Sequence, residues 1–408
     1  MEYPDKPVSF RWKQLREQVL TRTVPHTMVS WRFLLPNQSR AVKLHRKVFL
    51  GAWPQLPRWQ WALIALYSSM TWLLFFSWRQ IYRCMQADAR KLPDEYGIPV
   101  WKQLFDMLAL ALGHGVPPYF YSYYALYRKP REQWFQYVYS HELPHWHRVL
   151  SAGVSRQTEH LMTDKCAFST CMADLGIASV ETYAFLPRSA KVGESALFSG
   201  QSLFIKPNAG SRGEGAYALS FDAQTGQYRL TGDKVIEETA DILDHINRSA
   251  AQQDYLIQPL LQNHPEIEQL CGSQELVFLR VVTGIIDGEA EALFATLLVP
   301  CLNEYNIYWW VDVELSSGRL LPDKEYIRFD DLPEKIGKIE GKVLPFRQDV
   351  VEICCRAHRH FSDLPCIGWD VAITPSGVKL LEGNFNWGVA MHQRRVPALA
   401  TALLDVYR

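Results

Sequence analysis

The pattern of apolar and polar residues divides the chain near residue 130. Before that point the sequence is rich in apolar and aromatic residues, and it favours helices interrupted at Gly113 to Pro118. After it, short apolar runs alternate with turn signals such as Asp287-Gly288, which are typical of hairpins joined by helices. The pattern predicts an α+β fold with mainly antiparallel sheets over 131–408, preceded by a helical extension over 1–130.

One stretch of the extension, Trp59 to Trp78, carries no charge and has a tryptophan at each end. Its length nearly matches the apolar core of a bilayer, and tryptophans at the edges resemble an interfacial belt. We expect either a helix that lies in the cytoplasmic leaflet or a helix buried against the body of the protein.

A hairpin near the C-terminus carries the most informative polar residues. Strands over 367–374 and 378–384 would place Asp370 directly opposite Glu382, and Asn384 would share the face of Glu382. Facing carboxylates are unfavourable unless a cation lies between them, so the pattern predicts a divalent metal site. The alternative is a solvated face with Asn384 beginning a turn.

A second informative segment is a short apolar strand that ends in Lys206 and leads into a glycine-rich loop containing Ser211, Gly213 and Gly215. Glycines allow backbone N–H groups to approach an anion, and a lysine supplies a point charge for phosphate oxygens. The lysine precedes the glycines, so the segment is not a Walker A loop. A plain turn is the alternative interpretation.

These two features together, a lysine before a glycine-rich loop and a downstream D…E-x-N pattern, resemble the ATP-grasp superfamily. The resemblance is closest to its sugar-transfer-associated branch, which is similar to α-L-glutamate ligases. Three more segments occur in the same order as in the family: Thr163-Asp164-Lys165, the strand and hinge over 255–261, and Leu279-Arg280-Val281-Val282. The match spans roughly Lys165 to Gln393.

The resemblance implies two α+β lobes that close on ATP. Residues 131–200 would form entry helices, 201–262 the nucleotide-binding lobe, and 263–408 the metal and substrate lobe. The sequence departs from the family pattern at Gln258, where many relatives have an acidic residue, and at 303–310, which lack the expected glycine-rich signature.

The resemblance also implies a role for each matching residue. The residues implied to bind ATP are Lys165, Lys206, Ser211, Gly213, Gly215, Gln258, Leu260 and Glu266. The residues implied to hold Mg²⁺ or Mn²⁺ are Asp370, Glu382 and Asn384. Arg280, Lys206 and Asn386 are implied to act in catalysis.

The implied activity is ATP-dependent carboxylate–amine ligation through an acylphosphate, with an amide as product. Small-molecule carboxylates and amines would be the partners, in cell-surface polysaccharide, lipid or natural-product biosynthesis. Two alternatives remain open: a phosphotransferase that acts on a hydroxyl group, and a non-catalytic nucleotide-binding membrane scaffold.

Charge is distributed unevenly although the formal net charge is zero. Residues 1–58 hold eleven Lys and Arg against three Asp and Glu. Because no nucleic-acid-binding motif accompanies them, we expect residues 1–78 to contact an anionic membrane surface on its cytoplasmic side.

The eight cysteines show no CxxC spacing, which is expected of reduced thiols in the cytoplasm.

Overall fold

The computed structural model describes residues 27–52, 57–210, 214–232, 235–300, 308–322, 334–390 and 392–407. The chain forms two compact units. Unit 1 contains Met1–Ala152, Lys324–Asp331 and Gly388–Arg408, and unit 2 contains Gly153–Asp323 and Leu332–Trp387. The boundary predicted after residue 130 therefore falls inside unit 1.

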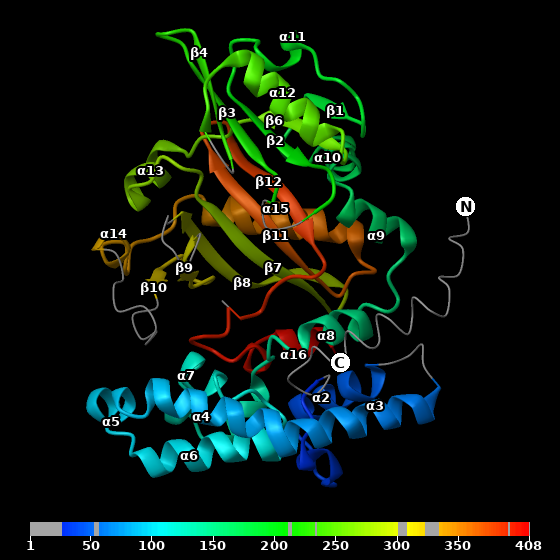
Figure 1. Ribbon diagram of the computed structural model, residues 1–408, viewed down its shortest axis with the longest axis vertical. Coiled ribbons are helices and arrows are strands. Elements are labelled where there is room, and N and C mark those ends of the chain that lie inside the picture. Colours follow the sequence, from blue (N-terminus) through cyan, green and yellow to red (C-terminus); the bar gives the residue numbers. More distant parts are fainter. Residues whose placement is uncertain are drawn as a thin grey trace. The chain divides into compact units, whose positions relative to one another are not determined.

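Unit 1 is helical in its described part (Figure 1). Its elements are η1 (Trp31–Leu34), α2 (Arg40–Gly51), α3 (Arg58–Thr71), η2 (Trp72–Phe76), α4 (Ser77–Asp88), α5 (Lys91–Tyr96), α6 (Val100–Leu108), η3 (Ala109–Gly113), α7 (Phe120–Tyr123), η4 (Leu126–Arg128), η5 (Arg131–Gln136), α8 (Leu143–Leu150), η7 (Ala398–Ala400) and α16 (Leu403–Val406).

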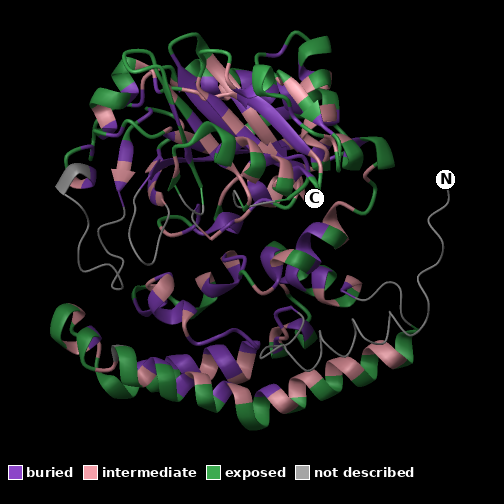
Figure 2. Ribbon diagram, turned by 45° about the horizontal axis from the view of Figure 1, so that its top comes forward, coloured by how far each residue is buried: buried purple, intermediate pink, exposed green. Residues whose placement is uncertain are grey.

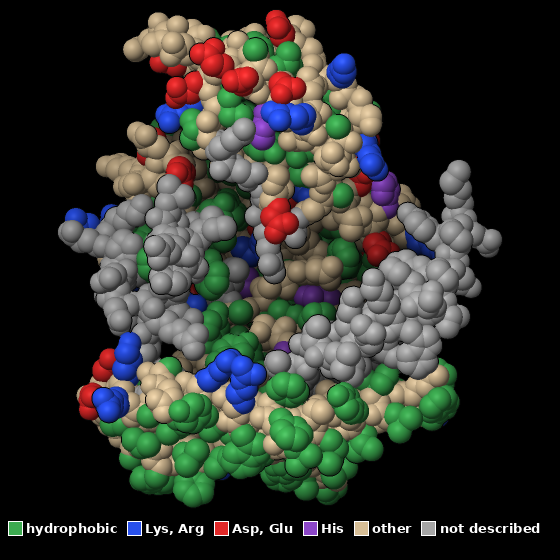
Figure 3. Space-filling view, viewed as in Figure 1, with side chains coloured by type: hydrophobic (Ala, Val, Ile, Leu, Met, Phe, Trp, Pro, Cys, Tyr) green, Lys and Arg blue, Asp and Glu red, His purple; other side chains and the backbone are tan. Residues whose placement is uncertain are grey.

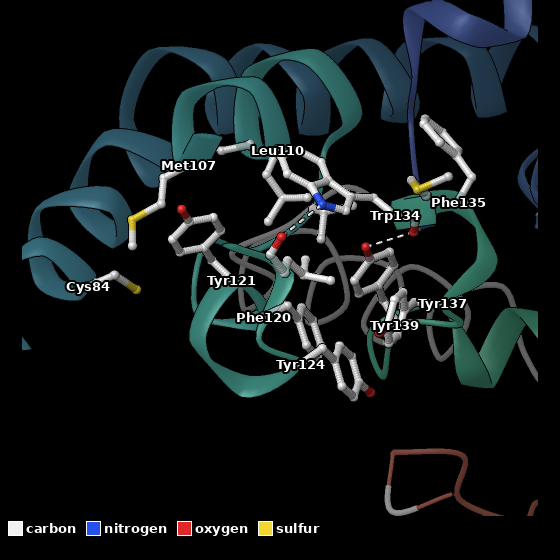
Figure 4. Close-up of a cluster of buried hydrophobic side chains, with 14 of the residues drawn as sticks. Cys84, Met107, Leu110, Phe120, Tyr121, Tyr124, Trp134, Phe135, Tyr137 and Tyr139 are labelled. Atoms are coloured by element: carbon white, nitrogen blue, oxygen red, sulfur yellow. Dashed lines mark hydrogen bonds between the residues drawn. The ribbon is translucent and has the colours of Figure 1, made fainter. Parts of the chain in front are cut away.

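The core of unit 1 is built mainly from aromatic side chains, which explains the aromatic-rich sequence of this region. Figure 4 shows tyrosines and phenylalanines from α7 and the following segments in one cluster that also contains Met107 and Leu110. The Tyr139 hydroxyl donates to the Trp134 carbonyl oxygen at 2.9 Å, so a polar tip in this core is satisfied. The unit therefore has its own hydrophobic core and is more than an appendage to unit 2.

Unit 2 contains two six-stranded antiparallel sheets among its described residues. In sheet A the strand order is β10-β9-β8-β7-β11-β12, and in sheet B it is β1-β6-β2-β3-β4-β5. The strands are β1 (Ala184–Leu186), β2 (Leu203–Pro207), β3 (Tyr217–Asp222), β4 (Gln227–Thr231), β5 (Val235–Ile236), β6 (Tyr255–Pro259), β7 (Phe278–Ile286), β8 (Glu289–Pro300), β9 (Tyr308–Val313), β10 (Leu320–Pro322), β11 (Cys366–Thr374) and β12 (Gly377–Asn384).

The remaining described elements of unit 2 are helices (Figure 1). They are α9 (Arg156–Thr163), α10 (Lys165–Asp174), α11 (Glu194–Leu197), α12 (Thr239–Ala250), α13 (Pro265–Cys271), α14 (Glu334–Gly337), α15 (Arg347–His358) and η6 (Arg359–Phe361). Helix α12 buries Ile242, Ile246 and Ala250 in the core of sheet B. This arrangement confirms the predicted α+β fold with antiparallel sheets and an N-terminal helical region.

Helix α15 packs on one face of sheet A and leaves the other face for polar residues. Buried His358 of α15 lies 2.6 Å from the hydroxyl of Thr283, which also accepts the indole N–H of Trp369 at 2.8 Å. Thr283 and Trp369 have odd numbers on β7 and β11, and residues two apart on a strand share a face. The even-numbered residues Arg280 and Asp370 therefore lie on the opposite face.

The hairpin of β11 and β12 agrees with the sequence prediction at the carboxylates and differs from it at the turn. Asp370 pairs with Glu382 as predicted. The turn is closed by Thr374 and Gly377, whereas Val378 was expected to oppose Thr374, so that detail of the prediction was wrong. A bulge between Asp370 and Val371 takes up the one-residue difference and restores the pairing of the two carboxylates.

Candidate active site

A polar row crosses one face of sheet A. Cross-strand pairing joins Glu382 to Asp370, Asp370 to Arg280, Arg280 to Thr296, and Thr296 to Asp312. Directly paired residues of antiparallel strands point to the same side of the sheet. Residues from five strands are thus aligned on a single face, and two of the predicted metal ligands and the predicted catalytic arginine are among them.

The two carboxylates of the row lie in a buried environment and repel each other. Burial raises the pKa of Asp370 to about 6, and the Glu382 charge acts in the same direction, against the opposing effect of Arg280. Burial also opposes ionisation of Glu382, but the hydrogen bond from Asn384 and the charges of Lys206 and Lys165 outweigh it and lower its pKa. Of the two carboxylates, Glu382 therefore keeps its charge to the lower pH.

Asn384 belongs to the same group of side chains. Its Nδ2 donates to Oε1 of Glu382 at 3.0 Å, so its own carbonyl oxygen stays available as an acceptor. The structure thus brings Asp370, Glu382 and Asn384 together, as the sequence predicted.

Arg280 contacts Asp370 directly through both branches of its guanidinium. Its Nε donates to Oδ1 of Asp370, and a terminal nitrogen donates to Oδ2 at 2.8 Å. Burial lowers the pKa of Arg280, but the adjacent Asp370 carboxylate outweighs burial and raises it. The sequence alone did not indicate this pair, because it depends on the alignment of β7 with β11.

Lys206 lies on β2 of sheet B and faces the acidic group of sheet A. Burial lowers its pKa, while the charges of Glu382 and Asp370 oppose that shift. The charge of Lys165 also acts on Lys206, and both predicted nucleotide-binding lysines act on Glu382. The two sheets of unit 2 therefore present opposite charges to one shared site.

A polar link that the sequence analysis missed joins the glycine-rich loop to the start of α10. Buried Asn208 accepts the Cys166 N–H at 3.0 Å and donates to Asp164 at 3.0 Å, and Asp164 caps α10 by accepting the Ala167 N–H at 2.8 Å. Lys165 reaches the Gly210 carbonyl oxygen at 2.8 Å. An Asp-Lys pair at a helix start followed downstream by Lys-Pro-Asn is the sequence signal for this link.

Part of the predicted phosphate loop lies outside the described residues, including Ser211 and Gly213. Gly215 is described and has a φ of +72°. A Cβ on Gly215 would lie 3.2 Å from the hydroxyl oxygen of Tyr255 and 3.3 Å from Cγ of Pro207. The close approach and the positive φ both explain a glycine here.

The predicted hinge strand is present as β6, and its polar residues have protein partners. Gln258 is buried and donates to the hydroxyl of Thr182 at 3.3 Å. The Leu260 N–H donates to the Ser202 carbonyl oxygen at 3.0 Å, so an adenine at the hinge would need other backbone groups. Glu266 is exposed in the first turn of α13.

Asn386 is exposed and follows β12 in unit 2. The neighbouring Trp387 is buried and lies over Gly368, where an added Cβ would come within 2.5 Å of Cβ of Trp387. A glycine at 368 thus allows the chain after β12 to pass directly above the row of polar side chains.

The residues present fit a hard divalent cation in their chemistry. Two carboxylates and an amide oxygen are donors that Mg²⁺ prefers, and a cation would relieve the repulsion between Asp370 and Glu382. Within the described residues no group of three or more His, Cys, Asp or Glu side chains converges, so Asn384 is needed to complete the set.

The site geometry agrees with a known protein family that the sequence matches. The model of the sugar-transfer associated ATP-grasp family matches residues 147–400, more than half of the chain. The chain therefore belongs to this family, and the predicted resemblance is confirmed. Membership supports ATP as the nucleotide and ATP-dependent carboxylate–amine ligation as the general class of chemistry.

Several solved structures are similar to this chain at low identity. D-alanine–D-alanine ligase from Helicobacter pylori shares 15% identity at a TM-score of 0.40, over 64% of this chain and 68% of that chain. D-alanine–D-alanine ligase from Bacillus anthracis complexed with ATP shares 12% identity at 0.37, over 62% and 64%. An ADP complex of N5-carboxyaminoimidazole ribonucleotide synthetase shares 9% at 0.38, over 60% and 52%. The comparison with curated proteins gives no match.

Proposed function

We propose that this protein is an ATP-dependent carboxylate–amine ligase that forms an amide through an acylphosphate. The observation that carries the proposal is the shared site of unit 2, where Glu382, Asp370 and Asn384 of sheet A face Lys206 of sheet B. Such a site combines oxygen ligands for a divalent cation with fixed positive charge for phosphate oxygens.

In the proposed reaction a substrate carboxylate attacks the γ-phosphorus of ATP, ADP leaves, and an amine then displaces phosphate from the acylphosphate. Lys206 and Lys165 would offset the charge on the transferred phosphoryl group. Mg²⁺ bound by Glu382, Asn384 and Asp370 would supply charge neutralisation at the phosphates. The substrate carboxylate is the nucleophile, so no activated Ser or Cys is required.

Arg280 would have two roles in this proposal. Its fork on Asp370 fixes the carboxylate beside Glu382 and compensates its charge when no nucleotide is bound. The catalytic role implied by the family resemblance would require at least one branch of the guanidinium to turn from Asp370 toward the phosphates.

Small-molecule carboxylates and amines are the proposed substrates, in assembly of cell-surface polysaccharide, lipid or natural products on the cytoplasmic side of a membrane. Tyr308 is one described side chain near the site. Burial raises its pKa and the charge of Asp370 adds to the shift, so Tyr308 lies near the carboxylates of the site. Its ring is proposed to contact a sugar or amine acceptor.

The test is acceptor-dependent ADP formation by the purified full chain with MgATP. Ligation predicts ADP, phosphate and an amide whose mass is the sum of the two acceptors less one water. A phosphorylated hydroxyl product would identify a phosphotransferase instead, and ATP binding without turnover for any pooled acceptor would favour a nucleotide-binding scaffold.

A further inference from the structure

Unit 1 contains one continuous helix that is long and apolar enough to cross a membrane. It runs from Arg58 to Ala87 through α3, η2 and α4, and 30 residues at 1.5 Å each extend about 45 Å. Only 11% of its most apolar window is buried, and α3 has no buried residue at all. Figure 2 shows α3 exposed or half-buried along its length.

The exposed apolar surface extends from this helix onto its neighbour. Fourteen of the 25 exposed large apolar side chains in the described structure lie between Trp59 and Phe105. They include Phe75 on η2, which is 67% exposed, and Trp101 on α6, which is 64% exposed. Figure 3 shows hydrophobic side chains gathered over α3, α4 and α6, and we call this surface the apolar face.

The opposite side of the same helices packs into the core of unit 1. Trp72, Ile81 and Cys84 are buried there with Met107 of α6. The Trp72 indole N–H donates to the Ala111 carbonyl oxygen at 2.7 Å, which joins the helix to η3. The helix is therefore fixed along its C-terminal half to a folded unit, and its exposed apolar side chains are concentrated in α3 and η2.

Between Arg58 and Ala87 the charged residues of this helix are all basic, and Asp88 ends α4. Arg58, Arg79 and Arg83 are exposed. Two copies of the apolar face placed against each other would bring like charges together. An anionic surface complements the same charges.

A hollow of about 770 Å³ next to η1 and α2 adds a second basic group. Lys43, Arg46 and Lys47 line it together with the exposed apolar side chains of Leu34 and Leu50. In the described structure none of the ion pairs involves these three basic residues. Cations beside exposed leucines match the headgroup and upper acyl chain of an anionic lipid.

Aromatic contacts place the hollow beside the apolar helix. Phe33, which lines the hollow, lies 6.0 Å from Phe49 between ring centroids, and Phe49 lies 5.3 Å from Trp61 of α3. The hollow and the N-terminal part of the apolar face therefore belong to neighbouring parts of unit 1.

We propose that unit 1 docks on an anionic phospholipid bilayer, with α3, α4 and α6 lying in the interfacial plane and the Lys43, Arg46 and Lys47 hollow holding a lipid phosphate. A helix fixed along one side to a folded unit can immerse its apolar side without crossing the bilayer. Exposed tryptophans such as Trp101 suit the headgroup boundary. This inference is independent of the chemistry proposed for unit 2.

Vesicle co-flotation of the full chain tests the basic hollow. The variant K43Q/R46Q/K47Q should partition onto phosphatidylcholine–phosphatidylglycerol vesicles roughly 100-fold more weakly than the wild type, and equally on pure phosphatidylcholine. A matched control, R188Q/K191Q/K342Q, removes three exposed charges from unit 2 and should bind like the wild type. Equal losses in both variants would overturn the assignment of the hollow.

A second variant tests the apolar face. L74S/F75S/W101S should lose binding to both kinds of vesicle while keeping the wild-type circular dichroism and MgATP turnover, since these side chains are exposed. Unchanged vesicle binding would overturn the proposal. A stable dimer of the wild type in light scattering that this variant loses, together with no vesicle binding by the wild type, would also overturn the proposal. The apolar face would then be assigned to a second copy of the chain.

Protease protection distinguishes an in-plane helix from a span. With protein added to preformed vesicles, a tag at residue 1 should be cleaved as fast as a tag at residue 408. Protection of the N-terminal tag together with resistance to alkaline carbonate would show that the helix crosses the bilayer and would overturn the in-plane arrangement.

Discussion

Replacing Arg280 by methionine would leave Asp370 as a buried carboxylate beside Glu382 without its bidentate partner. The Arg280 side chain is 18% exposed and that of Asp370 is 9% exposed, so solvent compensates neither charge well. Breaking a buried pair by removing one partner costs about 3–5 kcal/mol. We expect a loss of this size in the free energy of unfolding of unit 2 at pH 8, measured without metal or nucleotide.

The loss should depend on pH in a definite direction. The pKa of Asp370 is raised from 3.8 to about 6 by burial, so the folded state binds more protons than the unfolded state between these values. The contribution of Asp370 to wild-type stability therefore increases as pH falls below 6, by about 1.4 kcal/mol at pH 5. Without Arg280 the pKa of Asp370 rises further, so the increase in stability begins at a higher pH. The difference in the free energy of unfolding between variant and wild type therefore shrinks at pH 5.

Hydrogen exchange in a urea series, read from peptides covering β7 and β11, measures this stability within unit 2. The variant R356M removes an exposed arginine of the same unit and serves as the control, with an expected loss below about 1 kcal/mol. A loss at Arg280 that is no larger than the control, or that is the same at pH 5 and pH 8, would contradict a stabilising buried pair between Arg280 and Asp370.

Three further predictions concern the same unit. His358 is buried and burial lowers its pKa from 6.5 to about 4, so its contribution to the stability of unit 2 should fall by up to about 3 kcal/mol as pH falls from 6.5 toward 4. H358N should flatten this part of a profile of stability against pH measured by thermal melting, and an unchanged profile would exclude His358 as the source. Lys206→Met should weaken ATP binding at least 10-fold in calorimetry, and an unchanged affinity would mean that the loop after β2 is only a turn. Glu382→Gln should reduce MgATP turnover more than 100-fold with little change in melting temperature, whereas E352Q, on exposed Glu352 of α15, should retain it; equal activities would contradict the metal assignment.

Local pattern was sufficient to predict the hairpin and its carboxylates. The turn signal at 375–377 and the alternation on either side limit the pairing to a few registers. The bulge beside Asp370 was not predictable, because a bulge depends on how β12 packs on its outer side. There Val180 donates to the Leu380 carbonyl oxygen at 3.0 Å and adds a short parallel bridge.

Long-range partners account for most of what the sequence did not reveal. Arg280 and Asp370 are separated by 90 residues, and only the pairing of β7 with β11 brings them together. Asn208 similarly reaches Cys166 across 42 residues. Each residue taken alone satisfies an ordinary strand or loop pattern, so periodicity cannot show that they touch.

The division of the chain into two units also depends on contacts between residues far apart in the sequence. The sequence pattern predicts a division near residue 130, yet η5 and α8 follow that point within unit 1, and residues 388–408 return to the same unit. Within it, Gln393 accepts the Val138 N–H at 2.9 Å and donates to the Tyr124 hydroxyl at 2.7 Å. A return across more than 250 positions leaves no local signal.

The most direct test of ligase activity is ADP and phosphate release by the full chain with MgATP and pooled carboxylates and amines, combined with mass spectrometry of the products. A ligase should release ADP only when both a carboxylate and an amine are present, with a product lighter than their sum by one water. ADP release with a product heavier by one phosphoryl group, or bound ATP that no acceptor consumes, would contradict the ligase assignment.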